Sequence, residues 1–140
     1  MTASGDRRSP VRPSASQRDV LESPLSGTWR PTVRERAVLV GVGKGIAEED
    51  LDELAALADS AGADPVARLV QNRAEPDPST YVGKGKLGEL HDTVHAVGAD
   101  AVILDQELSP GQLRSLEERL GVKVIDRTAL ILDIFALHAR

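Results

Sequence analysis

Residues 101–126, AVILDQELSPGQLRSLEERLGVKVID, decide the fold. Two short, mostly apolar runs, Ala101–Leu104 and Val122–Ile125, flank a polar segment in which leucines recur at helical spacing. These leucines are Leu113, Leu116 and Leu120. Apolar runs of this kind are typical of parallel strands covered on both faces, and a leucine stripe is typical of the covering helix. The segment therefore predicts a β-α-β unit with a right-handed crossover.

The helix of this unit carries its own start and stop signals. Ser109 is placed as the N-cap, Pro110 falls in the first turn, and Gln112 stands three residues after the cap, as in a capping box. Gly121 stands where a helix stops. We therefore expect the helix to lie between Ser109 and Gly121.

The same alternation extends back to Ala37. Two more apolar runs occupy Ala37–Val42 and Val66–Val70. Two more helical stripes consist of Leu51, Leu54, Ala55 and Ala58, and of Leu87, Leu90, Val94 and Val97. The order is β-α-β, a long loop, then α-β-α-β-α. It predicts, for residues 36–140, a three-layer α/β domain with a doubly wound, mainly parallel four-stranded sheet flanked by helices.

Residues 1–35 differ from the rest of the chain. They are rich in Ser, Pro and Arg and lack apolar periodicity, which predicts a disordered tail. Residues 1–36 carry seven Lys and Arg against four Asp and Glu, whereas residues 37–140 carry ten against eighteen. Because the folded part is acidic, any RNA contact must come from a local cluster or from the basic tail. A passive solvated extension is the favoured reading of the tail.

Composition excludes several classes of function. The chain has no cysteine, which excludes disulfides, thiolate zinc sites and cysteine nucleophiles. Trp29, Tyr81 and Phe135 are its only aromatic residues, so base stacking across a sheet is not expected. No apolar run approaches the ~18 residues of a membrane span, and the N-terminus lacks the apolar core of a secretory signal. We expect a cytoplasmic protein without a membrane span.

Two loops carry the sequence Val-Gly-Lys-Gly. The first, 42–45, directly follows a predicted strand, and the second, 82–85, is followed by Lys86 and a helix. Glycines let backbone N–H groups approach an anion and lysines supply countercharge, so both loops are candidate phosphate contacts. Neither completes a Walker A loop, and the Gly-x-Gly-x-x-Gly match at 83–88 is only formal. A glycine turn is favoured for the first loop; for the second, turn and anion contact stay open.

Acidic residues follow the last two predicted strands. Asp105, Glu107 and Asp126 would lie together there, as magnesium ligands do in several α/β enzymes. Turn and capping hydrogen bonds are the more ordinary reading, because Asp105 lies ahead of the Ser109 cap and Asp126 just precedes Thr128. The acidic cluster is therefore a pocket hypothesis only.

His91 and His95 are one helical turn apart, a spacing that suits a metal ion. No third ligand is indicated, and His91 abuts the apolar stripe, so partial burial without a metal is favoured. We predict no metal site. Since no nucleophile elbow or serine triad pattern is present, we also predict no catalytic residue in this chain.

The last segment, Ala129–Leu137, is apolar almost all round. A helix of this kind must be buried on more than one side, and a four-stranded sheet offers it only one. Partial burial against the sheet edge is one explanation. The favoured one is that the chain is built to continue, or to meet a partner, where it ends.

Residues 35–140 resemble the N-terminal domain of the HflX-type ribosome-associated GTPases. The resemblance rests on RAVLVG at 36–41, LDELAALADSAG at 51–62, DPSTYVGKGK at 77–86, GADAVILD at 98–105 and ELSPGQLRSLEERLGVKVIDRTALILDIF at 107–135. The combination of 81–86 with the long stretch ending at Phe135, in this order and spacing, is specific.

The resemblance implies a parallel α/β subdomain. In the family it is followed by a long helical hairpin and a P-loop GTPase domain, in proteins that bind the large ribosomal subunit and separate ribosomes under stress. This chain stops in the helix after the last strand, so we expect the hairpin and the GTPase domain to be its missing partners, or an oligomer partner at Ala129–Leu137. The resemblance therefore implies no cofactor in this chain; GTP and Mg²⁺ are expected only with the missing GTPase domain.

In the family, the Tyr-Val-Gly-Lys-Gly-Lys segment looks like a functional surface. It makes five residues candidate contacts to ribosomal RNA phosphate or to nucleotide: Tyr81, Gly83, Lys84, Gly85 and Lys86. The favoured function is docking on the large ribosomal subunit as part of an HflX-like ribosome-splitting or rescue factor.

Two other functions stay open. One is an independent nucleotide- or magnesium-binding enzyme that uses residues 83–86 with Asp105 and Asp126. The other is a structural module that dimerises through residues 129–137.

Overall fold

The computed structural model describes residues 34–138, and for Leu137 and His138 it describes the backbone only. Of the predicted tail, residues 1–35, all but Arg34 and Glu35 lie outside the described residues. Glu35 already belongs to the first strand.

Four parallel strands form the sheet, as predicted. They are β1 (Glu35–Gly43), β2 (Ala63–Asn72), β3 (Ala101–Leu104) and β4 (Lys123–Asp126). Their order across the sheet is β2-β1-β3-β4, and every neighbouring pair is parallel. From β1 the chain goes first to β2 on one side and then crosses over to β3 on the other side of β1. The boundary between β1 and β3 is therefore the topological switch point of the sheet.

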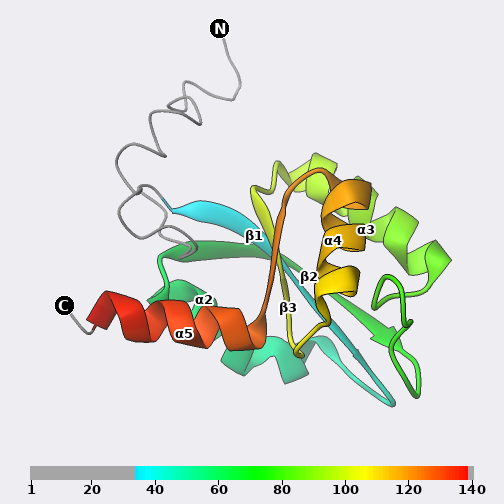
Figure 1. The fold of residues 1–140 in the computed structure, drawn as a ribbon, viewed down its shortest axis with the longest axis horizontal. Helices are drawn as coiled ribbons and strands as arrows, with labels where there is room; N and C mark the ends of the chain where they lie inside the picture. The colour runs from blue at the N-terminus through cyan, green and yellow to red at the C-terminus, as the bar shows by residue number, and fades with distance from the viewer. Residues whose placement is uncertain (1–33, 139–140) are drawn as a thin grey trace, which may run out of the picture. The chain divides into compact units, whose positions relative to one another are not determined.

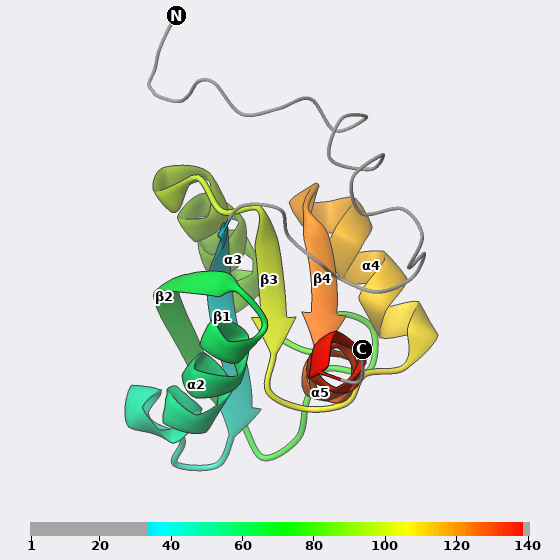
Figure 2. The ribbon, with the colours of Figure 1, turned by 90° about the vertical axis from the view of Figure 1, so that its left-hand side faces the viewer.

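Helices cover both faces of the sheet. On one face lie α2 (Asp52–Ser60), which follows the short 3-10 helix η2 (Glu48–Leu51), and α5 (Arg127–His138); on the other lie α3 (Lys84–Val97) and α4 (Pro110–Leu120), as Figure 1 and Figure 2 show. The predicted three-layer α/β architecture is confirmed. None of the helices between residues 34 and 138 is long and apolar enough to span a membrane.

Both faces of β1 are buried because its side chains alternate between the two helical layers. Val38, Val40 and Val42 belong to the apolar cluster that includes residues of α3 and α4. Leu39 and Ala37 lie at the alternate positions and are fully buried as well. The run at 37–42 is therefore apolar throughout because helices cover both faces of the strand, as predicted.

One strand is longer than its apolar run suggested. β2 begins at Ala63 and includes Pro65, which has no N–H to donate. The register with β1 shifts between Ala37 and Val38, opposite this proline. Since β2 is an edge strand of the sheet, it tolerates both the proline and the irregularity. The prediction began at Val66 because Asp64 and Pro65 are poor strand residues.

The capping box of α4 is confirmed. Oγ of Ser109 accepts the N–H of Gln112 at 3.1 Å, and Oε1 of Gln112 accepts the N–H of Ser109 at 2.9 Å. The helix ends at Gly121, whose φ of 72° is a left-handed conformation that favours glycine. These contacts fix both ends of the helix that precedes β4.

Replacing Ser109 by alanine is expected to lower the free energy of unfolding by about 1 kcal/mol, because the N–H of Gln112 loses its acceptor. Urea unfolding followed by circular dichroism measures this difference. Ser115→Ala, in the middle of the same helix, is the matched control and should change stability by less than ~0.5 kcal/mol. Equal losses in the two variants would contradict the capping role of Ser109.

Candidate functional site

The carboxyl ends of the strands form the edge at which open parallel α/β sheets bind ligands. The longest loop at this edge is residues 73–83, between β2 and α3, and it carries the start of the Tyr81–Lys86 segment. This loop also contacts the beginning of α4, since Nε2 of Gln112 donates to the carbonyl oxygen of Asp77 at 2.9 Å. It therefore crosses the sheet edge from β2 toward α4.

The side chain of Tyr81 fills the switch point. It is 1% exposed. Its phenol oxygen accepts the N–H of Val42 at 3.2 Å, and its O–H donates to Oε1 of Gln106 at 2.7 Å. Val42 belongs to β1 and Gln106 follows β3, so the phenol bridges the two strands at the switch point. A ligand in this crevice would have to displace a buried, doubly hydrogen-bonded side chain.

β1 needs this acceptor because it extends beyond β3. The pairing of the two strands ends at Val40 and Leu104, and the N–H of Asp105 still donates to the carbonyl of Val40 at 2.9 Å. The next N–H of β1 on this side is that of Val42, and no strand lies beside it. A buried N–H without an acceptor costs about 1–3 kcal/mol, so the phenol of Tyr81 removes a substantial penalty.

The loop that carries Tyr81 is fixed by its own chain. Tyr81 has a φ of 68°, a conformation that costs a non-glycine residue on the order of 1 kcal/mol. Two reciprocal backbone hydrogen bonds with Asp77, both 2.9 Å long, hold it there. The carboxylate of Asp77 accepts the N–H groups of Ser79 at 2.8 Å and Thr80 at 3.1 Å, and these two donors lower its pKa from the usual value. The loop is therefore a preformed element.

The other four residues of the predicted surface lie at the start of α3. The N–H of Gly83 donates to Oε1 of Gln71 at 2.8 Å, which joins this turn to β2. Lys84 and Gly85 are exposed. Lys86 is partly buried, and its Nζ lies 2.9 Å from Oε1 of Glu89. The structure thus places these four residues on one turn and buries Tyr81 beneath it.

The first turn of α3 presents bare backbone to solvent. A Cβ at Gly85 or Gly88 would meet no atom within 4 Å, so packing inside the domain does not require glycine at either position. In a helix, glycine is about 0.5–1 kcal/mol less favourable than alanine. The first N–H groups of a helix have no partner in the helix itself, and they carry the positive end of its dipole. With Lys84 beside it, this turn is suited to contact an anion such as phosphate.

The first Val-Gly-Lys-Gly loop, residues 42–45, forms a turn and does not begin a helix. Gly45 has a φ of 70°, and its N–H donates to Oδ1 of Asn72 at 2.8 Å, so residues 44 and 45 form a turn between β1 and η2. Lys44 is exposed but does not begin a helix. It therefore lacks the helix N-terminus that accompanies Lys84.

The acidic candidates have other partners. Asp126 accepts the N–H of Leu108 at 2.9 Å and that of Ala129 at 3.0 Å, and it caps α5. Asp105 pairs with Arg127 at 2.8 Å, and the same guanidinium contacts Glu53 at 2.7 Å. Burial raises the pKa of Asp105, and Arg127 opposes that rise.

Glu107, the third acidic candidate, is exposed. No group of three acidic or histidine side chains in residues 34–138 is arranged to hold a metal ion. The ion pair with Arg127 therefore accounts for the position of the Asp105 carboxylate, and loop and capping hydrogen bonds account for that of Asp126.

Sequence reasoning missed Gln71 and Gln106, which hold Gly83 and Tyr81, and it did not anticipate that the side chain of Tyr81 is buried. Single glutamines near strand ends form no recognisable pattern. The one available signal was the tyrosine itself: the chain has only one, and it lies in the long loop at the ligand-binding edge. The O–H of a buried tyrosine usually finds a hydrogen-bond partner.

The titration of Tyr81 tests this arrangement. Burial raises the pKa of Tyr81 from 10 to about 12, although the N–H of Val42 opposes the rise. Because this is the only tyrosine, phenolate absorbance reports it alone. We expect a midpoint near pH 12 in the folded chain and near pH 10 in urea. A midpoint near 10 in the folded chain would contradict the burial of the phenol.

The same pKa shift predicts how stability depends on pH. The folded state holds the phenol proton more tightly than the unfolded state, so this contribution is complete below pH 10 and is lost as the pH rises to about 12. Tyr81→Phe should lack this part of the alkaline loss. At neutral pH the variant should be less stable by about 1–3 kcal/mol, because Val42 loses its acceptor. Urea unfolding of both proteins across this pH range measures the difference.

Comparison with known proteins agrees with this architecture. Residues 48–136 match the family described as GTP-binding GTPase N-terminal. The GTPase HflX of Lacrimispora saccharolytica is 47% identical over 110 residues, which are 76% of this chain and 26% of that protein. The GTPase HflX of Escherichia coli is 47% identical over 92 residues, which are 66% of this chain and 22% of that protein. The chain therefore spans about a quarter of the length of these relatives.

Solved structures show the same fold. A GTP-binding protein from the archaeon Sulfolobus solfataricus, in complex with GDP, superposes with a TM-score of 0.56 at 23% identity, over 74% of this chain and 31% of that one. The expected resemblance to the N-terminal domain of the HflX-type GTPases is confirmed. The chain belongs to the GTP-binding GTPase N-terminal family.

Proposed function

We propose that this chain is a docking domain through which an HflX-like GTP-binding protein attaches to the large ribosomal subunit in the cytoplasm, in order to split or rescue ribosomes. The observation that carries the proposal is the turn Lys84–Gly85–Lys86 at the start of α3, in which Lys84 and Gly85 are exposed. The family of the chain supports the setting. The proposed contact is with phosphates of ribosomal RNA.

The proposed contact with RNA phosphates depends on positive charge in the turn itself. Residues 37–140 carry ten Lys and Arg against eighteen Asp and Glu, so the domain as a whole repels a polyanion. No ion pair within residues 34–138 involves Lys84, whereas Lys86 is shared with Glu89. Lys84 is therefore the main cation of the turn. Few phosphate contacts imply modest affinity and a shallow dependence on salt.

The proposal assigns GTP and Mg²⁺ to the rest of a longer protein. The 140 residues contain no Gly, four residues, Gly-Lys-Ser/Thr sequence. An independent nucleotide-binding enzyme has less support, because the phenol of Tyr81 occupies the crevice at the switch point. A magnesium enzyme has less support because Asp105 and Asp126 are engaged by Arg127 and by two backbone N–H groups.

Cosedimentation with purified large ribosomal subunits tests the docking surface. At low salt we expect the chain to pellet with the subunits and the Lys84→Ala, Lys86→Ala double variant to bind at least about tenfold more weakly, since charge-assisted contacts are lost. Lys84→Ala alone should account for most of the effect. Binding of the wild type should weaken at moderate salt.

Lys44→Ala is the matched control, because Lys44 is an exposed lysine in the other Val-Gly-Lys-Gly loop. It should bind as the wild type does. No binding of the wild type at either salt concentration, or an equal loss in Lys44→Ala, would contradict docking through the α3 turn.

A second contact surface is proposed on α5. Three of its apolar side chains face solvent: Ile131 is 36% exposed, Leu132 61% and Phe135 71%. Leu130, by contrast, is fully buried against the domain. An exposed apolar stripe of this kind marks a contact with other polypeptide. We propose that the remainder of a longer, HflX-like protein covers it, and that without that cover two copies of the chain associate here.

Polar substitutions on this stripe should separate packing from association. Leu132→Gln with Phe135→Gln is expected to reduce concentration-dependent association in sedimentation velocity, and to change the free energy of unfolding by less than about 1 kcal/mol. Leu130→Ala, at the fully buried position, should cost about 2–5 kcal/mol. If the double variant lost as much stability as Leu130→Ala, the stripe would be core rather than contact surface.

A further inference from the structure

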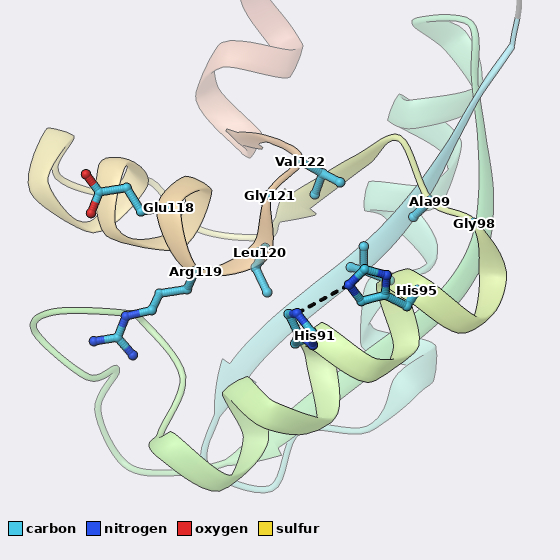
Figure 3. A pocket seen from close by; sticks show the side chains of 10 residues that line it. His91, His95, Gly98, Ala99, Glu118, Arg119, Leu120, Gly121 and Val122 are labelled. Carbon is cyan, nitrogen blue, oxygen red and sulfur yellow. Dashed lines mark hydrogen bonds between the residues drawn. The ribbon is translucent and has the colours of Figure 1, made fainter. Parts of the chain in front are cut away.

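A hollow of about 360 Å³ lies between α3 and α4 at the opposite end of the strands from Tyr81. Its wall includes Gly98 and Ala99, which precede β3, and Gly121 and Val122, which precede β4. Figure 3 shows His91 and His95 on the α3 side of this hollow, facing the end of α4. The function proposed above makes no use of it.

The two imidazoles approach each other closely. His91 and His95 are one turn apart on α3, so their side chains leave the same side of the helix. Their Nε2 atoms are 3.3 Å apart, with ring centroids 4.5 Å apart and planes inclined by 62° (Figure 3). Two neutral imidazoles at this distance share one hydrogen bond, for which one Nε2 must carry a proton.

This separation matches the spacing of two nitrogen ligands on one metal ion. Zinc binds imidazole nitrogen at about 2.0–2.1 Å with tetrahedral angles, which places two ligand nitrogens about 3.3–3.4 Å apart. Neutral imidazole is a preferred ligand of zinc, copper and nickel. The nitrogen separation therefore suits chelation, and the two rings would have to turn from their present edge contact so that both Nε2 atoms face the ion.

The surroundings favour the required tautomer of His91. Its Nδ1 lies 3.5 Å from Oδ1 of the neighbouring Asp92. A carboxylate beside Nδ1 favours a proton on that nitrogen, which leaves Nε2 free as the ligand atom.

From this geometry we propose that His91 and His95 bind a divalent ion of the zinc type through their Nε2 atoms. The remaining coordination positions belong to water or to an external ligand in the hollow, because residues 34–138 bring no third acidic or histidine side chain into a metal-binding group with them. Glu118 lines the facing wall, but its carboxylate is turned away from the imidazoles in Figure 3. The site is thus an open, exchangeable one rather than a structural zinc centre.

Calorimetric titration of the whole untagged chain with Zn²⁺ tests this site. We expect one ion per chain, and an affinity at least about tenfold weaker in His91→Ala and in His95→Ala, because each variant removes one of the two ligands. His138→Ala, the third histidine of the sequence, is the matched control and should bind as the wild type does.

Thermal unfolding supplies a second measurement. Because the ion binds the folded chain, Zn²⁺ should raise the melting temperature of the wild type and of His138→Ala, but not of His91→Ala or His95→Ala. No binding by the wild type at about 1 mM Zn²⁺ would mean that the two imidazoles only share a hydrogen bond. Equal binding by His91→Ala or His95→Ala would place the ion elsewhere. Either result overturns the proposal.

Discussion

The phenol of Tyr81 supplies an acceptor that β1 lacks, and the carboxyl-terminal edge of the sheet is organised around it. β3 ends at Leu104 while β1 continues to Gly43, so the N–H of Val42 is buried with no strand beside it. A side chain delivered from the loop after β2 takes that position and reaches on to Gln106. One pair of hydrogen bonds therefore joins β1, the long loop and the turn after β3.

This constraint explains why the domain is better suited to present a surface than to enclose a ligand. The crevice that other doubly wound sheets offer to nucleotides is filled from within. The same loop then continues into α3, so the position of Lys84 is fixed by the burial of Tyr81 three residues earlier. A preformed turn loses little conformational entropy when it binds, which supports the proposed contact with an anion.

The layers of the fold were predictable because they depend on local patterns. The capping box at Ser109 and the apolar run at 37–42 in β1 are patterns of neighbouring residues, and both were confirmed. What escaped prediction depends on contacts between distant residues: the 39-residue separation of Val42 and Tyr81, or the bridge from Arg127 to Asp105 and Glu53. Composition and periodicity do not predict which distant residues will contact each other. The proposed contact surface at 83–86 was predicted from its glycines and lysines, but the hydrogen bonds that hold this turn in place were not.

The exchange of the Val42 amide proton with solvent, followed residue by residue by NMR, tests the central role of Tyr81 most directly. If the phenol is its acceptor, this amide should exchange as slowly as those inside the β1–β3 ladder, although no strand covers it. Exchange as fast as that of the exposed turn at 44 and 45 would show that the N–H of Val42 is open to water. It would then contradict the account in which Tyr81 closes the switch point and fixes the surface above it.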